Sequence, residues 1–514
     1  MKVFMAQLFV QAGKPEENFE VVKAAVERGK AAGADVVLLP ECSIAGSCML
    51  GSLGDEIEFL ERCAQCRDKV KELSHGVDIL LGGSDTLAGE GLYFQKGEVA
   101  RWGHDFEVLS GYATFVLDKN VAVQGACASH AKKLSQPVFY VDAVGTENSG
   151  KNIYAMDGDS GVWDKEGNRV FAMPRFQVAE CLVTVGDDGS VSGFPQGTVA
   201  AQERIALIHD ALVFMIRENL KKFHISRMVI GASGGIDSAV SAALYAEAIG
   251  AKNVYLINMP TRFNSATTRG AAKALADNLG CPYMVAPISD IVSAVCNTLE
   301  GCTFERDDTP MKVEGINHEN LQARTRSASV LLTIASVLGA GITCNGNKSE
   351  ATAGYCTLYG DSCGVMCALG DLWKTDVYAL ARYINREKEV IPQASIDIPA
   401  SAELSDAMNV DEGKGDPIKY PYHDKLFAEW VDKGCSLENT ERRLAAGFEK
   451  FCEDLSVDLN YFKSLFKTPE EALQDMRAWH RRFRGIALAK RIQFPPILSL
   501  SGTAFGAEYP ESQV

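Results

Sequence analysis

A short loop between an apolar run and an alanine-rich stretch carries the residues best suited to chemistry. The run at 228–230 has the composition of a buried strand, and a helical pattern follows the loop. The loop itself, 231–238, reads GASGGIDS. Strand, small-residue loop and helix together turn backbone N–H groups toward an anion. Gly234 and Gly235 let a phosphate approach closely, and the Asp237 carboxylate fits there if a divalent cation is shared with the phosphates.

A glycine turn capped by Ser or Asp is the simpler interpretation of this loop. Its place between a strand and a helix favours an anion site, because structural context is what supports a short motif. The G-x-x-x-x-G-K-[ST] spacing of a Walker A loop is absent. The sequence SGGIDS at 233–238 instead resembles the pyrophosphate-binding loop of the ATP pyrophosphatase superfamily. That resemblance implies an enzyme that adenylylates a carbonyl or amide oxygen and releases pyrophosphate.

Four further motifs follow in order: ENLQAR at 319–324, NGNKSE at 345–350, GYCTLYGD at 354–361 and DLWKT at 371–375. With the loop, they resemble NAD synthetase from about residue 203 to the C-terminus. The resemblance implies that ATP transfers AMP to the nicotinic acid carboxylate of deamido-NAD, and that ammonia then displaces AMP to give NAD. The reacting groups are anions, so catalysis should depend on positioning and on charge neutralisation by metal and cationic side chains.

The resemblance also implies roles for single residues. It implies ATP as co-substrate, catalytic roles for Asp237 and Lys374, and Mg²⁺ held by Asp237 and Glu350. Contacts with ATP are expected from Gly231, Ser233, Gly234, Gly235, Ile236, Asp237, Ser238, Asn345, Lys374 and Ser401. Contacts with deamido-NAD are expected from Arg324, Lys348, Asp361 and Lys490. The family often has Thr where Asn345 stands, which leaves that ATP contact open.

Each charged candidate also has a structural interpretation when it is taken alone. Arg324 fits a solvated helix residue, and Lys490 fits an exposed basic tail. Lys374 fits the start of a helix that is capped by a neighbouring Thr. Glu350 fits a charge that is favoured near a helix N-terminus. The set of motifs, rather than any one residue, supports the functional interpretation.

The first part of the chain resembles the nitrilase-like amidohydrolase domain that is fused to glutamine-dependent NAD synthetases. In that domain a Glu acts as base, a Lys stabilises the oxyanion and a Cys attacks the glutamine amide. Glu41 is the candidate base, but the segment 101–112 lacks the family's Lys. Cys127 is the candidate nucleophile and lacks the acidic residue that follows it in the family. We predict a degenerate domain without glutaminase activity; a working glutaminase using Cys127 or another thiol is the alternative.

Alternating strands and helices predict a two-domain α/β protein. Residues 1–185 are expected to form a truncated nitrilase-like α/β sandwich, with a strand at 121–126. A Gly- and Ser-rich connector is expected at 186–202. Residues 203–514 are expected to form the NAD synthetase domain, a doubly wound parallel sheet of the adenine nucleotide α-hydrolase kind with ligands beyond the strand ends. One amphipathic helix is expected over 438–451.

Composition limits the partners of this 514-residue chain. A net charge of −16 argues against nucleic acid and anionic membranes as partners. The 15 Cys are scattered and are expected to be reduced thiols of a cytoplasmic protein. No signal peptide and no run of 18 apolar residues is evident. By resemblance to other NAD synthetases a homodimer or higher homo-oligomer is expected. A non-catalytic nucleotide-binding or assembly protein is the alternative from another class, and the joint presence of Asp237, Glu350 and Lys374 argues against it.

Overall fold

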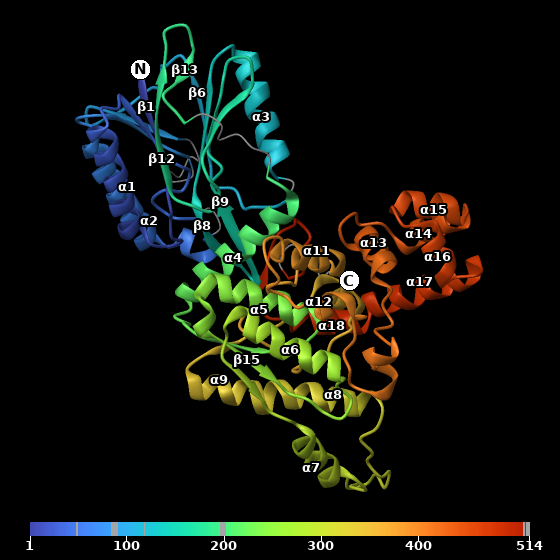
Figure 1. The fold of residues 1–514 in the computed structure, drawn as a ribbon. Coiled ribbons are helices and arrows are strands. Elements are labelled where there is room, and N and C mark those ends of the chain that lie inside the picture. Colours follow the sequence, from blue (N-terminus) through green and yellow to red (C-terminus); the bar gives the residue numbers. More distant parts are fainter. Residues whose placement is uncertain (48–49, 84–90, 118, 196–201, 507–508, 510–514) are drawn as a thin grey trace. The chain divides into compact units, whose positions relative to one another are not determined.

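The computed structural model describes residues 1–514 except 48–49, 84–90, 118, 196–201, 507–508 and 510–514 (Figure 1). The chain divides into two compact units. The first comprises Met1–Ser149 and Ile153–Met215, and the second comprises Gly150–Asn152 and Ile216–Val514. Among the described residues, none of the helices combines the length and the apolar character that crossing a bilayer requires.

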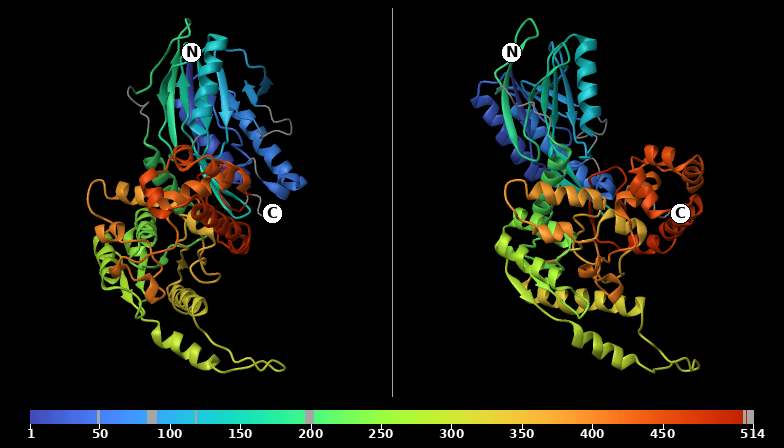
Figure 2. Two further views of the ribbon diagram at one scale, coloured as in Figure 1. Left: turned by 90° about the vertical axis from the view of Figure 1, so that its right-hand side faces the viewer. Right: turned by 45° about the vertical axis from the view of Figure 1, so that its right-hand side comes forward.

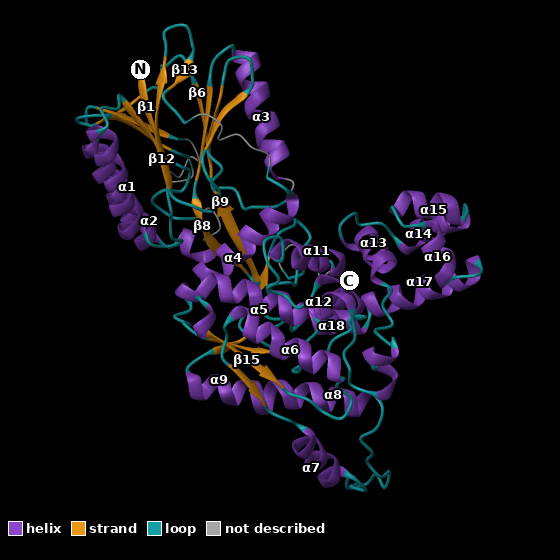
Figure 3. Ribbon diagram, viewed as in Figure 1, coloured by secondary structure: helices purple, strands orange, loops and turns teal. Residues whose placement is uncertain are grey.

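Two sheets and three helices build most of the first unit (Figure 3). One sheet has seven strands, in the order β13 (Val191–Ser192), β12 (Ala179–Val185), β1 (Lys2–Gln7), β2 (Val36–Leu38), β3 (Asp78–Leu81), β4 (Leu92–Gln95) and β5 (Glu98–Ala100). The other has four, in the order β11 (Arg169–Ala172), β10 (Gly161–Trp163), β7 (Val138–Asp142) and β6 (Glu107–Gly111). The helices are α1 (Pro15–Ala31), α2 (Ile57–Leu73) and α3 (Lys119–Leu134), and β8 (Val144–Ser149) and β9 (Asn152–Asp157) follow β7.

The alternating side chains of β1 show how these layers stack. Phe4 and Ala6 belong to the core that includes residues of α1 and α2. Val3 and Met5 belong to a second core, together with Phe139 and other residues of the four-stranded sheet. Because successive strand side chains point to opposite faces, helices cover one face of the large sheet and the small sheet covers the other.

Two expectations for the first unit differ from the structure. The strand expected at 121–126 lies within helix α3. A short apolar alternation does not distinguish strand from helix, and here Cys127 and Ala131, one helical turn apart, pack together against the four-stranded sheet. The stretch 186–202, expected as a connector, contains β13, which pairs with β12.

The second unit is built on a parallel sheet. Its strand order is β16 (Tyr283–Val285), β15 (Val254–Asn258), β14 (Met228–Gly231) and β17 (Gly341–Ile342), and all three pairings are parallel. Helix α4 (Arg204–Lys222) includes the last residues of the first unit and continues into the second. The helices that accompany the strands of the second unit are α5 (Ile236–Ile249), α6 (Ala266–Leu279), α7 (Ser289–Leu299), α8 (Ile316–Arg324), the π-helical η3 (Thr325–Leu331) and α9 (Leu332–Leu338). The expected parallel α/β architecture is therefore present.

The remaining helices follow β17. They are α10 (Lys348–Ala353), α11 (Lys374–Ile384), α12 (Gln393–Asp397), α13 (Tyr420–Val431), α14 (Leu437–Ala445), α15 (Phe448–Leu455), α16 (Leu459–Leu465), α17 (Pro469–Arg484) and α18 (Ile486–Ile492). Helices α13 to α17 gather side by side around an aromatic core (Figure 2). The single helix expected over 438–451 is broken between α14 and α15, because Gly447 has φ +117°.

One cysteine departs from the expectation of reduced thiols. Cys42, which is buried in the turn after β2, is disulfide-bonded. Cys63, Cys66 and the other described cysteines outside that bond are free. The expectation is therefore wrong for Cys42, because sequence spacing does not show which thiols a fold brings within bonding distance.

Candidate active site

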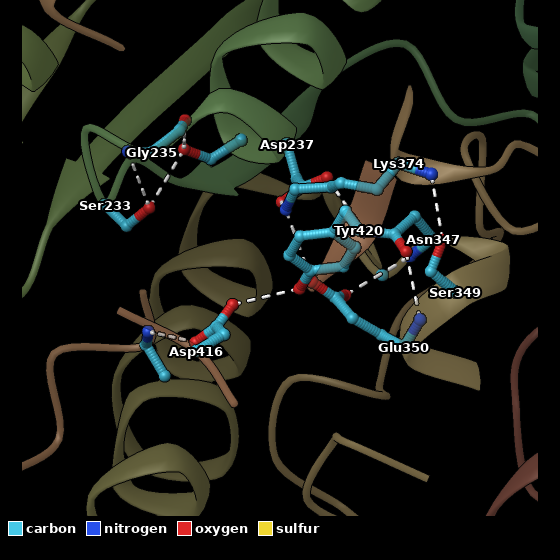
Figure 4. Close-up of polar contacts among 12 residues, drawn as sticks. Ser233, Gly235, Asp237, Asn347, Ser349, Glu350, Lys374, Asp416 and Tyr420 are labelled. Atoms are coloured by element: carbon cyan, nitrogen blue, oxygen red, sulfur yellow. Dashed lines mark hydrogen bonds and ion pairs between the residues drawn. The ribbon is translucent and has the colours of Figure 1, made fainter. Parts of the chain in front are cut away.

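The loop between β14 and α5 has the form that its sequence predicts (Figure 4). Gly231 ends β14, and Gly235 is the N-cap of α5, whose first turn begins with Ile236. The Ser233 hydroxyl accepts the N–H of Gly235 at 3.2 Å, and its Oγ lies 3.1 Å from the Oγ of Ser238. The first N–H groups of a helix have no partner within it, so this loop offers backbone and hydroxyl donors to an anion.

Gly234 cannot be replaced by a larger residue without a backbone shift. Its φ is +88°, and a Cβ there would lie 2.0 Å from the carbonyl oxygen of Thr268 in α6. On its other side, its own carbonyl accepts the hydroxyl of Ser395 at 2.8 Å. The glycine loop is therefore packed directly against the first turn of α6.

A buried lysine joins two carboxylates beside this loop (Figure 4). Lys374 begins α11, and its side chain is 2% exposed. Its ammonium donates to Asp237 Oδ2 and lies 3.5 Å from Glu350 Oε1. The ring of Tyr420 lies 5.1 Å from the same ammonium, and the Tyr420 hydroxyl donates to Asp416 at 3.0 Å. Three predicted residues, Asp237, Glu350 and Lys374, thus meet at one point.

Burial and like charge determine how this cluster ionises. The pKa of Glu350 is raised to about 8, first by burial and second by the Asp237 carboxylate beside it. Burial alone would lower the pKa of Lys374, but the carboxylates around it outweigh burial and raise that pKa. Burial also raises the pKa of Asp416. A further cation at the cluster would favour the ionised carboxylates.

Asn347 links the two carboxylates through the backbone of α10. It is the N-cap of this helix and forms a capping box with Glu350. The Asn347 side chain accepts the N–H of Glu350 at 3.0 Å and donates to Asp237 Oδ1 at 3.0 Å. Asn347 was not among the predicted site residues, although the Asn-x-x-Glu spacing is a signal for such a cap. Asp416 and Tyr420 were not predicted either, because no local motif marks them.

The residues present fit a magnesium ion shared with phosphates. Asp237 and Glu350 supply carboxylate oxygens, the ligands that Mg²⁺ prefers, beside donors suited to phosphate. Within the described part of the chain, no three His, Cys, Asp or Glu side chains are grouped closely enough to form a metal site of their own. Mg²⁺ commonly uses one or two carboxylates together with substrate phosphates and water, so two protein ligands are sufficient.

The other predicted ATP contacts lie on loops of the second unit. Asn345 accepts the hydroxyl of Thr343 at 2.9 Å. The Ser401 hydroxyl donates to the carbonyl of Met408 at 2.6 Å. Both side chains are thus held by neighbouring residues of their own loops.

Three of the predicted dinucleotide contacts meet at the GYCTLYGD segment. Arg324 donates to the carbonyl of Leu358 at 3.1 Å, and Asp361 accepts the N–H of Thr357 at 2.6 Å. Lys490 donates to two carbonyls that follow α10, one of them at 2.7 Å. The structure thus brings the ENLQAR segment and the tail to the same loop.

Lys348, the fourth predicted dinucleotide contact, is buried in a polar network. Its ammonium lies 2.8 Å from Asp371, 3.0 Å from Asp432, 3.2 Å from Ser501 and 3.1 Å from Thr503. An ammonium has three donors, and these four acceptors share them. The contact between Lys348 and the dinucleotide remains a prediction.

In the first unit the candidate base and the candidate nucleophile of a glutaminase lie on different layers. Glu41 follows β2 of the seven-stranded sheet. Cys127 is buried on α3 and packs with Tyr140 and Trp163 of the four-stranded sheet. Burial raises the pKa of Cys127 to about 12. A thiol nucleophile must react as the thiolate, so this environment suits a structural cysteine better than a catalytic one.

Comparison with known proteins adds to this geometry. Residues 208–453 match the family model described as NAD synthase. These residues form an NAD synthase domain. It contains the glycine loop, Glu350 and Lys374.

The similarity extends beyond this domain. The chain is 28% identical to the glutamine-dependent NAD(+) synthetase of Synechocystis sp., over 87% of this chain and 91% of that protein. The solved structure of the glutamine-dependent NAD(+) synthetase from Cytophaga hutchinsonii has a TM-score of 0.75 at 15% identity, over 99% of this chain and 96% of that one. The corresponding structure from Acinetobacter baumannii, in complex with ADP, has a TM-score of 0.68 at 21% identity, over 99% and 97%. The two solved structures confirm the predicted two-part fold. The family model and the Synechocystis relative confirm the resemblance to NAD synthetase and the ligase class.

Proposed function

We propose that this protein is an NAD synthase that amidates deamido-NAD with ATP and ammonia. The observation that carries the proposal is the meeting of Asp237, Glu350 and Lys374 beside the glycine loop, inside the NAD synthase domain. A non-catalytic nucleotide-binding protein would need the phosphate donors, but it would not need a buried lysine between two carboxylates. We also propose the predicted boundaries, 1–185 and 203–514, for the two domains.

In the proposed reaction the loop N–H groups, Ser233 and Ser238 bind the phosphates of ATP. Asp237 and Glu350 would hold Mg²⁺, which would offset the negative charge of those phosphates. The carboxylate oxygen of deamido-NAD forms a bond to the α-phosphorus, the bond to the bridging oxygen breaks, and pyrophosphate leaves. Ammonia then attacks the acyl carbon, AMP leaves with the bonding electron pair, and the nitrogen loses a proton. Lys374 supports the phosphates as a fixed positive charge.

Contacts with the remaining parts of the substrates are proposed from the predicted residues. Asn345 and Ser401 are assigned to ATP, and Arg324, Asp361 and Lys490 to deamido-NAD, with Lys348 kept as a weaker candidate. A soluble homodimer in the cytoplasm is also proposed. Light scattering of the purified protein tests the dimer, and a monomeric mass at working concentration would contradict it.

We propose that the first unit lacks glutaminase activity, so that ammonia is the nitrogen source. The proposal is supported by the environment of Cys127, which lies within a helix and whose pKa is raised to about 12 by burial. Glutamine as the source is the second candidate, because relatives similar over most of the chain are named glutamine-dependent.

NAD formation from deamido-NAD, ATP and Mg²⁺ tests both points. With ammonium chloride we expect NAD, AMP and pyrophosphate in equal amounts, and with glutamine we expect a rate near the background. Robust turnover with glutamine that Cys127→Ala abolishes would contradict the assignment of ammonia. Asp237→Ala should lower the rate at least about a hundredfold, whereas Asp290→Ala, an exposed control on α7, should leave it unchanged.

A further inference from the structure

Glu403 is a buried carboxylate in an unusual backbone conformation. Glu403 lies in the segment 399–404 and is 3% exposed. Its φ is +46°, in the left-handed region that residues with a side chain rarely adopt. Such conformations persist where surrounding contacts fix them, and they gather at functional sites. The contacts of the Glu403 side chain therefore indicate the function of this backbone conformation.

The Glu403 carboxylate forms hydrogen bonds with the N-terminal end of α6. Oε1 accepts the N–H of Ser265, the N-cap of that helix, at 3.1 Å. Oε2 accepts the hydroxyl of Thr268 at 2.7 Å and the side-chain amide of Asn264 at 3.4 Å. A carboxylate at a helix N-terminus is favoured by the helix dipole and by the unpaired N–H groups there. Glu403 thus fixes the first turn of α6 from another segment of the chain.

This first turn of α6 is the surface on which the glycine loop rests. A Cβ on Gly234 would lie only 2.0 Å from the carbonyl oxygen of Thr268. One residue, Thr268, therefore contacts Glu403 through its hydroxyl and Gly234 through its backbone. A shift of Thr268 would change the position of the loop whose N–H groups are proposed to bind the phosphates.

The segment that carries Glu403 is itself held on both sides. The N–H of Ala402 donates to Asp416 at 3.2 Å, and the carbonyl of Leu404 accepts the Gln322 side chain at 2.9 Å. Because these contacts fix the backbone on both sides of Glu403, its carboxylate can hold the first turn of α6 in place.

We propose that Glu403 is a positioning residue for ATP, which sets the phosphate loop through Thr268 and Gly234. The inference rests on the proposed function, since it names a residue that supports the same site. Glu403 does not touch the phosphates in this arrangement. Its loss should weaken ATP binding and leave the dinucleotide part of the site in place.

Calorimetry of ATP binding with Mg²⁺, together with steady-state kinetics, tests the proposal. Glu403→Gln keeps the size of the side chain but presents an amide N–H₂ to donors. We expect the Kd and the KM for ATP to rise about tenfold, as loss of a hydrogen bond to a charged group predicts, with the KM for deamido-NAD within about twofold of wild type. Glu412→Gln, an exposed control in the following loop, should match wild type.

Variants of Thr268 keep the test decisive if Glu403→Gln folds poorly. Thr268→Val removes the hydroxyl at nearly constant shape and should weaken ATP binding as Glu403→Gln does. Thr268→Ser keeps the hydroxyl and should bind ATP as wild type does. Unchanged ATP affinity in a folded Glu403→Gln, or equal rises in both KM values, would overturn the inference. If the wild-type chain makes no NAD and binds no ATP, the proposed function fails instead, before any variant is compared.

Discussion

Lys374 is the residue on which the charge balance of the site depends. Its ammonium contacts both Asp237 and Glu350, and its side chain is almost fully buried. Breaking a buried ion pair from one side is costly, because the remaining charge keeps its desolvation without its partner. Here the remaining charges would be two neighbouring carboxylates, which are the groups proposed to hold Mg²⁺.

We therefore expect Lys374→Met to lose NAD synthase activity and to depend on Mg²⁺ for stability. Without the lysine, the paired carboxylates should bind Mg²⁺ more tightly, so adding the ion should raise the Tm of the variant more than that of wild type. Thermal unfolding with and without added Mg²⁺ measures the difference. Lys414→Met, which replaces an exposed lysine, is the control. An equal Mg²⁺ effect in both variants would contradict the assignment of the carboxylates.

Gly234→Ala tests the close approach of the glycine loop to α6. The added methyl would meet the Thr268 carbonyl, and φ +88° would be strained as well, so ATP binding should fall at least about tenfold. Gly270→Ala, within α6 and with open space around its position, should be neutral or stabilising by about 0.5–1 kcal/mol. Calorimetry and urea unfolding measure the two effects. ATP affinity unchanged in Gly234→Ala would show that the loop does not hold the phosphates.

Three helices of the second unit are joined at one buried carboxylate. Asp424 of α13 accepts the Ser349 hydroxyl of α10 at 2.6 Å and the N–H of Thr375 in α11 at 2.9 Å. The Ser349 hydroxyl also accepts the N–H of Lys374 at 2.9 Å. These contacts fix the starts of α10 and α11, the helices that carry Glu350 and Lys374.

This junction predicts a pH dependence of stability. Burial raises the pKa of Asp424 to about 6, above its ordinary value of 3.8. The folded state therefore binds this proton more tightly than the unfolded state, and the contribution of Asp424 to stability falls as pH rises from about 4 to beyond 6. The loss is at most about 3 kcal/mol. In Asp424→Asn, the free energy of unfolding should differ less between about pH 4 and pH 7 than it does in wild type, as measured by urea unfolding. A difference as large as that of wild type would contradict the prediction.

Local patterns predicted the elements that carry the site, and long-range packing determined the rest. The strand, glycine loop and start of α5 are specified by adjacent residues, so their geometry was predictable. Helix α3 was mistaken for a strand in part, because its burial depends on a sheet distant in sequence. Asp416 and Tyr420 join Lys374 from more than 40 residues away, and no spacing rule marks them. The ligands predicted from motifs and the contacts added by folding meet at the same lysine.

On the scale of the whole molecule, the chain combines a domain that matches the NAD synthase family model with a first unit whose expected nucleophile is buried. The thiol of Cys127 packs among aromatic side chains of the four-stranded sheet, and its pKa is raised to about 12. At neutral pH such a group is a thiol rather than a thiolate, and it is hidden from solvent.

Alkylation should therefore distinguish Cys127 from an exposed cysteine. In the native protein at about pH 8, iodoacetamide should modify the exposed Cys302 within minutes and leave Cys127 unmodified until the chain unfolds. Mass spectrometry of peptides from native and urea-treated samples measures the difference. Rapid native modification of Cys127 would show a reactive nucleophile and would favour the glutamine-dependent alternative.

Transfer of oxygen from substrate to product tests the central proposal most directly. Deamido-NAD labelled with ¹⁸O in its nicotinic acid carboxylate is converted with ATP, Mg²⁺ and ammonium, and the AMP is analysed by mass spectrometry. Adenylylation of that carboxylate predicts one ¹⁸O atom in each AMP and none in pyrophosphate. AMP without the label, in a reaction that still forms NAD, would contradict the mechanism assigned to this site.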